Sequence, residues 1–100
     1  MFEVNGVEYD LKFNVRKQDE IEKVADVSIM AEFNKTSGLL SLNLLRTMFT
    51  AGLVEAETGK PVKGKKALDL FDEVLENNGY QGTVNATLNK FTEDMGFLFR

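Results

Sequence analysis

The first residues of the chain alternate between hydrophobic and polar side chains, the pattern of a two-stranded hairpin. Asn5-Gly6 interrupts this alternation. Asn-Gly favours a type I′ turn of two residues, because both positions tolerate the positive φ that this turn requires. The resulting register places the hydrophobic side chains on one face and predicts two cross-strand pairs, Val4 with Val7 and Phe2 with Tyr9. We therefore predict a β-hairpin over residues 1–14, packed through that face on the rest of the chain.

Residues 16–100 are predicted to be mostly helical, because their hydrophobic residues recur at every third or fourth position. The expected helices are 16–25, ended by Asp26; 41–55, with Ser41 as N-cap; 66–77, stopped by Asn78-Gly79; and 83–95, capped by Thr83. Their spacing assigns Val24 and Leu68 to buried faces. Residues 27–34 fit either a further short helix or an irregular crossing. The expected fold is α+β, one domain over residues 1–100 in which the hairpin packs on four or five helices.

A lysine-rich segment separates two of these helices. Residues 57–64 hold the only proline and two glycines, and are expected to form a mobile loop. The run Gly59–Lys66 superficially suggests a phosphate-binding loop, but the spacing is wrong and no Ser or Thr follows its Gly-Lys. We interpret it as a flexible surface loop whose lysines can meet an acidic protein partner, with Lys60, Lys63 and Lys65 as candidate contacts.

Composition removes most catalytic chemistry. The chain has no cysteine and no histidine, so thiolate nucleophiles, imidazole bases and the commonest zinc ligands are absent. Carboxylates are plentiful but lie on polar helix faces beside lysines, as in the Asp69–Glu76 stretch, where a solvated surface is the plain interpretation. A metal-dependent hydrolase on that stretch is the weakest hypothesis. We predict a protein that is not an enzyme and has no catalytic residues, cofactor or metal site.

Charge and hydropathy restrict the kinds of partner and the cellular compartment that we expect. Sixteen acidic and 12 basic residues give a net charge of -4, which repels nucleic acid. No hydrophobic run is long enough to span a membrane. The N-terminal MFEVNGVEYD lacks the basic start and apolar run of a secretory signal. We expect a cytoplasmic protein that binds neither nucleic acid nor membrane.

Two hydrophobic clusters are candidate partner contacts if they are exposed. Three large apolar side chains close the chain at Phe97, Leu98 and Phe99, although chain ends usually fray. They either fold back on the core, for example as an edge strand beside the hairpin, or form an exposed patch for another protein. Leu39 and Leu40, beside the Gly38 turn, pose the same alternative. These five residues complete the candidate partner-binding set.

The order of several segments resembles the tail assembly chaperones of long-tailed phages and prophages of Gram-positive bacteria. The segments are MFEVNGVEYDLKFNV, SGLLSLNLLRTMFTAGL, ENNGY and DMGFLFR, and the likeness runs along the whole chain with 57–64 as its variable part. None of them is a chemical motif, so the likeness rests on order and spacing. The chain departs from the pattern at Ala25-Asp26-Val27, where Leu-Gly is expected before Ser28.

The resemblance implies a function. Such a protein binds the long, hydrophobic tape measure protein and helps to recruit tail tube subunits in the cytoplasm of the bacterial host, and is absent from the finished virion. A longer product made by ribosomal frameshifting is common in the family. Many weak contacts along one client become strong together, so self-association is a secondary expectation. The alternative is a small phage-encoded adaptor or inhibitor that binds a host protein.

Overall fold

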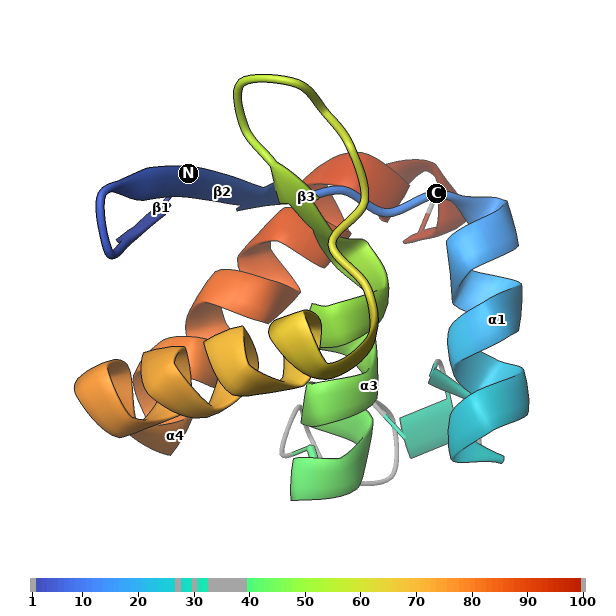
Figure 1. Ribbon diagram of the computed structural model, residues 1–100. Helices are drawn as coiled ribbons and strands as arrows, with labels where there is room; N and C mark the ends of the chain where they lie inside the picture. The colour runs from blue at the N-terminus through green and yellow to red at the C-terminus, as the bar shows by residue number, and fades with distance from the viewer. Residues whose placement is uncertain (1, 27, 30, 33–39, 100) are drawn as a thin grey trace.

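The computed structural model describes residues 2–26, 28, 29, 31, 32 and 40–99. They form a small antiparallel sheet and a larger helical part, so the fold is α+β, as the sequence predicts (Figure 1). In chain order the elements are β1 (Phe2–Val4), β2 (Val7–Leu11), α1 (Val15–Ala25), α3 (Leu42–Gly52), β3 (Leu53–Glu55), α4 (Gly64–Met95) and the 3₁₀ helix η1 (Gly96–Phe99).

The predicted hairpin is present as β1 and β2. Its cross-strand pairs are those expected, Val4 with Val7 and Phe2 with Tyr9. Asn5 and Gly6 have φ values of 52° and 83°, the positive values that a type I′ turn requires. The ring of Phe2 lies 5.7 Å from that of Phe49 in α3, centroid to centroid. The hairpin therefore packs its hydrophobic face on the helical part, although Val7 beside the turn stays exposed.

A third strand completes the sheet in the order β1-β2-β3. The prediction of a helix to about Glu55 is wrong here, because α3 ends at Gly52 and β3 pairs antiparallel with β2. Leu53 opposes Leu11, and both side chains are buried. Leu53 also fits the helical spacing of α3, so hydrophobic periodicity could not mark the point at which the backbone leaves the helix.

The segment predicted as a mobile loop returns along β3. The amide of Glu55 donates to the carbonyl of Lys60 at 2.9 Å, and that of Val62 donates to the carbonyl of Leu53 at 3.0 Å. Pro61 forms a bridge with Val54, and the Val62 side chain is buried. Backbone bonds thus hold the base of this segment against the sheet, while mobility of its tip stays a prediction.

Side-chain caps fix the starts of α1 and α3. The Asn14 carboxamide oxygen accepts from the amide of Lys17 at 2.8 Å, and the Ser41 hydroxyl accepts from the amide of Leu44 at 3.0 Å. The predicted cap at Ser41 is therefore confirmed. Asp26 ends α1 in the left-handed conformation, with φ 56° and ψ 38°, which confirms the predicted end of that helix.

Residues 27–34, for which two interpretations were open, lie only partly within the described residues. The amide of Glu32 donates to the carbonyl of Ser28 at 2.9 Å, the bond of a helical turn. Ile29 is fully buried, and its amide donates to the Glu22 carboxylate at 2.7 Å. Ile29 therefore belongs to the core. Residues 34–38, whose turn chemistry predicts a loop ending at Gly38, lie outside the described residues.

The two helices predicted for the C-terminal third join into the single element α4. Gly79 interrupts it with φ 75° and ψ 172°, so the predicted glycine stop is real. The helix resumes directly after it, and Thr83 is not a cap: its hydroxyl donates back to the carbonyl of Gly79 at 2.8 Å. The described part of the chain therefore holds three α-helices, and the prediction of four or five is corrected.

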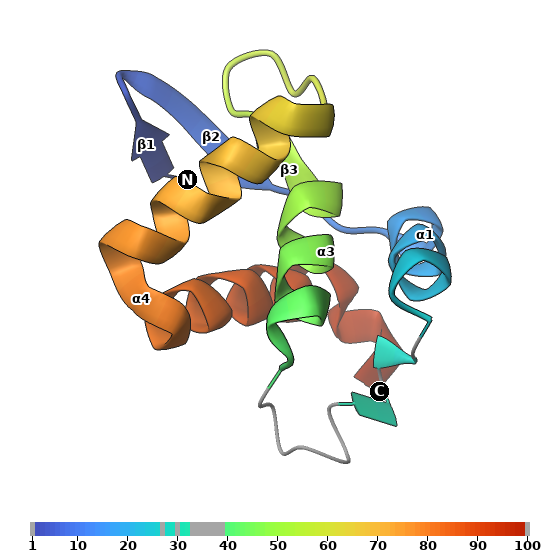
Figure 2. The same cartoon turned by 60° about the horizontal axis from the view of Figure 1, so that its bottom comes forward.

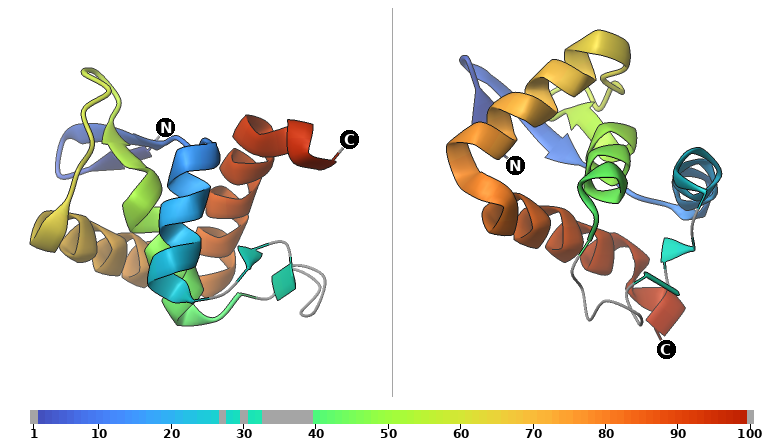
Figure 3. Two further views of the ribbon diagram at one scale, coloured as in Figure 1. Left: turned by 90° about the vertical axis from the view of Figure 1, so that its right-hand side faces the viewer. Right: turned by 90° about the horizontal axis from the view of Figure 1, so that it is seen from below.

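α3 stands at the centre of the molecule. Figures 2 and 3 show α1 on one side of it, the two arms of the kinked α4 around the other, and the sheet across its C-terminal end. Three fully buried rings mark the core, at Phe49, Phe71 and Phe91. Phe49 meets Phe71 edge-on with 5.4 Å between centroids. Aromatic contacts therefore connect α3 to both the sheet and α4.

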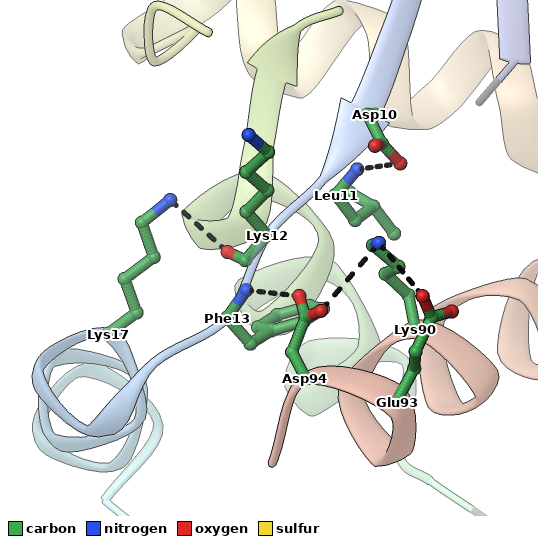
Figure 4. A network of polar contacts seen from close by, with 8 residues as sticks. All are labelled: Asp10, Leu11, Lys12, Phe13, Lys17, Lys90, Glu93 and Asp94. Atoms are coloured by element: carbon green, nitrogen blue, oxygen red, sulfur yellow. Dashed lines mark hydrogen bonds and ion pairs between the residues drawn. The ribbon is translucent and has the colours of Figure 1, made fainter.

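A polar network ties the connection between β2 and α1 to the end of α4 (Figure 4). The amide of Phe13 donates to the Asp94 carboxylate at 2.9 Å. The Lys90 ammonium lies 3.6 Å from carboxylate oxygens of both Asp94 and Glu93. Burial lowers the pKa of Lys90, but Asp94, Asp10 and Glu93 together outweigh it and raise the pKa above its ordinary value. The charged ammonium therefore favours the folded state.

Candidate functional site

A groove of about 390 Å³ is lined by residues of α1, α3 and the start of α4, and we call it the basic groove. α3 and α4 line it with small residues, Thr47, Thr50, Ala51, Gly64 and Ala67. The side chain of Ile21 in α1 also lines it and is fully buried. Short side chains between helices leave room for the side chains of another molecule.

Two larger apolar side chains line the groove from helices on either side. Val24 of α1 is 75% exposed and Leu68 of α4 is 45% exposed. A hydrophobic side chain that is exposed singly needs no explanation, but two of them in one concave, largely apolar site are typical of a surface that meets a partner. The basic groove is therefore the candidate binding site.

Basic groups dominate the charged residues of this groove. Among its described lining residues, Arg46 and Lys63 are basic and Glu20 is acidic. The Arg46 guanidinium carbon lies 5.7 Å from the centroid of the Phe71 ring, a cation–π contact that helps to fix its position. Lys63 stands at the N-terminus of α4, and its side chain makes no capping hydrogen bond there. The positive end of the helix dipole thus adds to the two cations.

The positive potential extends toward the start of α1. Burial lowers the pKa of Lys17, and the nearby charges of Lys12 and Lys63 lower it further, against the opposing effects of Glu20 and Asp94. The Lys63 side chain therefore lines the groove, and its charge also repels that of Lys17 in α1. An acidic group that approaches this side of the molecule would relieve repulsion among these cations.

The three lysines predicted as partner contacts lie in different surroundings. Lys63 lines the basic groove. The Lys65 ammonium pairs with Asp69 at 3.1 Å, with both side chains largely exposed. Lys60 is exposed in the loop beside β3, where its carbonyl accepts from the amide of Glu55. The structure therefore brings only Lys63 of the three to the candidate site, and the partner role of all three stays a prediction.

The hydrophobic candidates divide in the same way. Leu40 is only 4% exposed and belongs to the core, and the Tyr80 hydroxyl donates to its carbonyl. Leu39 lies outside the described residues. Phe97 is 47% exposed. Leu98 and Phe99 belong to η1 by their backbone, but their side chains lie outside the described part. The segment is a 3₁₀ helix and not the edge strand that was one example of how it could fold back on the core.

Sequence reasoning missed the two residues that define the groove. Val24 and Leu68 fit the helical spacing of their neighbours and were assigned to buried faces. Each instead lies at the edge of its stripe. Ile21, three residues before Val24, and Ala67, directly before Leu68, are the buried residues there. A sequence gives the period of a hydrophobic stripe but not its width, which depends on how closely the next helix approaches.

The carboxylates of the chain do not assemble into a metal site among the described residues, where no group of three or more potential ligands converges. Asp69 of the acidic stretch is engaged with Lys65, and Glu73 accepts a bond of 3.4 Å from the Asn5 side chain. The predicted lack of catalytic chemistry stays a prediction. Among the described residues there is also no helix with the length and hydropathy to cross a membrane.

Models of protein families, curated protein sequences and solved structures give no match to this chain.

Proposed function

We propose that this protein is a binding module that holds a hydrophobic segment of a partner in the basic groove, in the manner of a chaperone. The observation that carries this proposal is the exposure of Val24 and Leu68 in one groove lined by short side chains. The cations Arg46 and Lys63 in the groove favour a segment that carries acidic residues beside its apolar ones.

The resemblance in the sequence suggests the partner. In the proposed role the protein is a phage tail assembly chaperone: it binds the tape measure protein, helps to recruit tail tube subunits in the host cytoplasm, and leaves before the virion is complete. A long hydrophobic client needs shielding until assembly, and an acidic protein with a local apolar groove is suited to that work. The resemblance and the groove are independent supports for this role.

A single groove makes a weak contact. Burying a side chain such as Val24 or Leu68 contributes about 1–2 kcal/mol, and association itself costs several kcal/mol. Many copies along one extended client would bind much more strongly together, because neighbouring sites raise the effective concentration. We therefore include self-association on the client in the proposal.

Co-expression with the tape measure protein of the same phage or prophage tests the proposal. The expected result is that the client stays soluble and copurifies with the chain. Val24→Gln and Leu68→Gln should each reduce the soluble client several-fold. The matched controls are Val15→Gln and Leu42→Gln, because these residues are 59% and 45% exposed and lie outside the groove.

Circular dichroism would establish that all four variants fold, as expected for changes at exposed positions. A client that stays insoluble beside the wild-type protein, or equal effects of groove and control variants, would contradict the proposal. The same purification separates the alternative, an adaptor or inhibitor of a host protein. In that case the groove variants would lose a host protein, and the tape measure protein would not copurify.

A further inference from the structure

A second groove lies on another part of the surface, between β1 and the inner side of the kinked α4. Its volume is about 510 Å³, and it shares no lining residue with the basic groove. We call it the acidic groove. Phe2, Val4 and Leu11 of the sheet and Phe49 of α3 give it an apolar lining, which Val74 continues on the first arm of α4.

Two residues with little or no side chain on α4 help to keep this groove open. Gly82 and Ala86 lie one helical turn apart, are exposed, and line the groove. Gly82 is not required by backbone or packing: its φ is not positive, and an added Cβ would meet only the Asn78 Cβ at 3.4 Å. Gly82 lies in the first turn after the break at Gly79, where glycine costs up to about 1 kcal/mol relative to alanine. The glycine therefore lowers the stability of the helix while it leaves the α4 side of the groove without a side chain at that position.

The charges of this groove are opposite to those of the basic groove. Glu3, Asp10 and Glu93 line it together with one cation, Lys90. Lys90 is already engaged with Asp94 and Glu93, as Figure 4 shows, and its side chain is only 24% exposed. The described lining therefore has a net negative charge, although Glu93 already pairs with Lys90. Glu3 lies on the edge strand β1 and is exposed.

We propose that the acidic groove binds a basic amphipathic segment of a partner protein. Apolar side chains of the segment would pack on Phe2 and Val74, and its lysines or arginines would lie beside Glu3 and would share Glu93 with Lys90. This site is separate from the one that carries the proposed function, so either can fail without the other. With both grooves occupied, the protein joins two partners of opposite charge.

The lysine-rich segment 60–66 of a second copy fits the groove less well. It has one large apolar side chain, Val62, which is 5% exposed and packed in the core. This segment of a copy would therefore bring charge without apolar contact. Another protein that offers both on one segment matches the apolar lining and the negative charge together.

The probe for the test is a synthetic peptide of leucine and lysine in amphipathic helical order, with a second peptide in which glutamate replaces lysine. Both are titrated into the full-length ¹⁵N-labelled protein. The lysine peptide should shift the amide signals of Glu3, Gly82 and Ala86, and the glutamate peptide should leave them in place. Shifts confined to other surfaces, or equal effects of the two peptides, would overturn the proposal.

Filling the groove gives the sharper test. Ala86→Phe should weaken binding of the lysine peptide by about tenfold or more, equivalent to about 1.4 kcal/mol. Asn85→Phe is the matched control, because Asn85 is the neighbouring exposed residue and does not line the groove. Removing charge in the double variant Glu3→Gln, Glu93→Gln should weaken binding several-fold and reduce its dependence on salt. Equal weakening by Asn85→Phe would refute the site.

Two further outcomes are decisive. Val24→Gln in the basic groove should leave binding of the lysine peptide unchanged, and a loss would show that the peptide binds there instead. Sedimentation of the protein without peptide should show no association that Ala86→Phe removes. Association that depends on Ala86 would assign the groove to a second copy and overturn the proposal of a foreign basic segment.

Discussion

The ring of Phe13 lies so close to Gly52 that a Cβ on the glycine would stand 2.8 Å from two ring atoms. Gly52 ends α3, and its carbonyl accepts from the amide of Lys12 at 2.9 Å. On its other side Phe13 meets the ring of Phe91 edge-on, with 5.4 Å between centroids. The absence of a side chain at Gly52 therefore allows the sheet connection, α3 and α4 to meet at one point.

Gly52→Ala should lower the free energy of unfolding by about 1–3 kcal/mol, the usual cost of overpacking a core. The ring cannot move away freely, because Phe91 and the bond from Phe13 to Asp94 hold it. Urea denaturation followed by circular dichroism measures the change. Gly82→Ala is the control and should raise stability by about 0.5–1 kcal/mol. A loss of equal size in both variants would contradict the role given to Phe13.

Local chemistry allowed part of this fold to be predicted. The turn at Asn5-Gly6, the cap at Ser41 and the helix end at Asp26 each follow from residues adjacent in sequence, and each is present. These signals work because a positive φ or an unpaired helix amide is satisfied within a few residues. The hairpin and the ends of two helices could therefore be placed without knowledge of the tertiary structure.

Features that depend on distant partners could not be predicted. β3 exists because Leu53 finds Leu11 across the sheet, and nothing near Leu53 in sequence distinguishes it from another helical position. Val24 and Leu68 are likewise exposed because of where the neighbouring helices lie. The candidate site was therefore predicted only through Lys63, while its apolar part depends on the packing of three helices.

The raised pKa of Lys90 should make the stability of the protein depend measurably on pH. The pKa of this lysine is raised in the folded protein from an ordinary value of 10.5, because the three nearby carboxylates outweigh burial. The stabilisation is therefore fully present below pH 10.5 and is lost as the pH rises through the raised pKa. Lys90→Gln should cost about 0.5–1 kcal/mol at neutral pH, and the difference from wild type should shrink above pH 10.5.

Denaturant unfolding at pH 7 and at pH 11 gives the two differences for Lys90→Gln. The comparison variant is Lys65→Gln, whose ion pair with Asp69 is largely exposed on both sides. It should change stability by less than about 0.5 kcal/mol at neutral pH. A cost for Lys90→Gln that grows with pH would show that the network with Asp94 does not favour the charged lysine.

Asp26→Gly should increase the stability of the protein. Asp26 holds φ 56° at the end of α1, a conformation that glycine adopts without the steric penalty of a side chain. The expected gain in free energy of unfolding is about 0.5–1 kcal/mol, which for a domain of this size raises Tm by a few degrees. Thermal unfolding measures the change in Tm. Gly79→Ala is the comparison variant and should lower Tm.

Gly79 holds φ 75° and ψ 172° between the two arms of α4, a region that is nearly restricted to glycine. Gly79→Ala should therefore lower the free energy of unfolding by about 1–3 kcal/mol. A lower Tm for Asp26→Gly, or an unchanged Tm for Gly79→Ala, would mean that the backbone at that position differs from the one described.

Substitution of Arg46 and of Lys63 should distinguish effects on binding in the basic groove from effects on stability. Both residues line the groove, but only Arg46 also lies over the ring of Phe71. Arg46→Gln and Lys63→Gln should each weaken binding of an acidic amphipathic peptide several-fold and reduce its dependence on salt. Only Arg46→Gln should also lower the free energy of unfolding, by about 0.5–1 kcal/mol for the lost cation–π contact.

Fluorescence polarisation with a labelled peptide of leucine and glutamate measures the first effect, and urea denaturation measures the second. Because the two variants remove the same charge from one groove, a difference in stability between them reports the contact with Phe71. Binding that survives both substitutions unchanged would show that the cations of this groove do not select the partner. The apolar pair Val24 and Leu68 would then determine the binding alone.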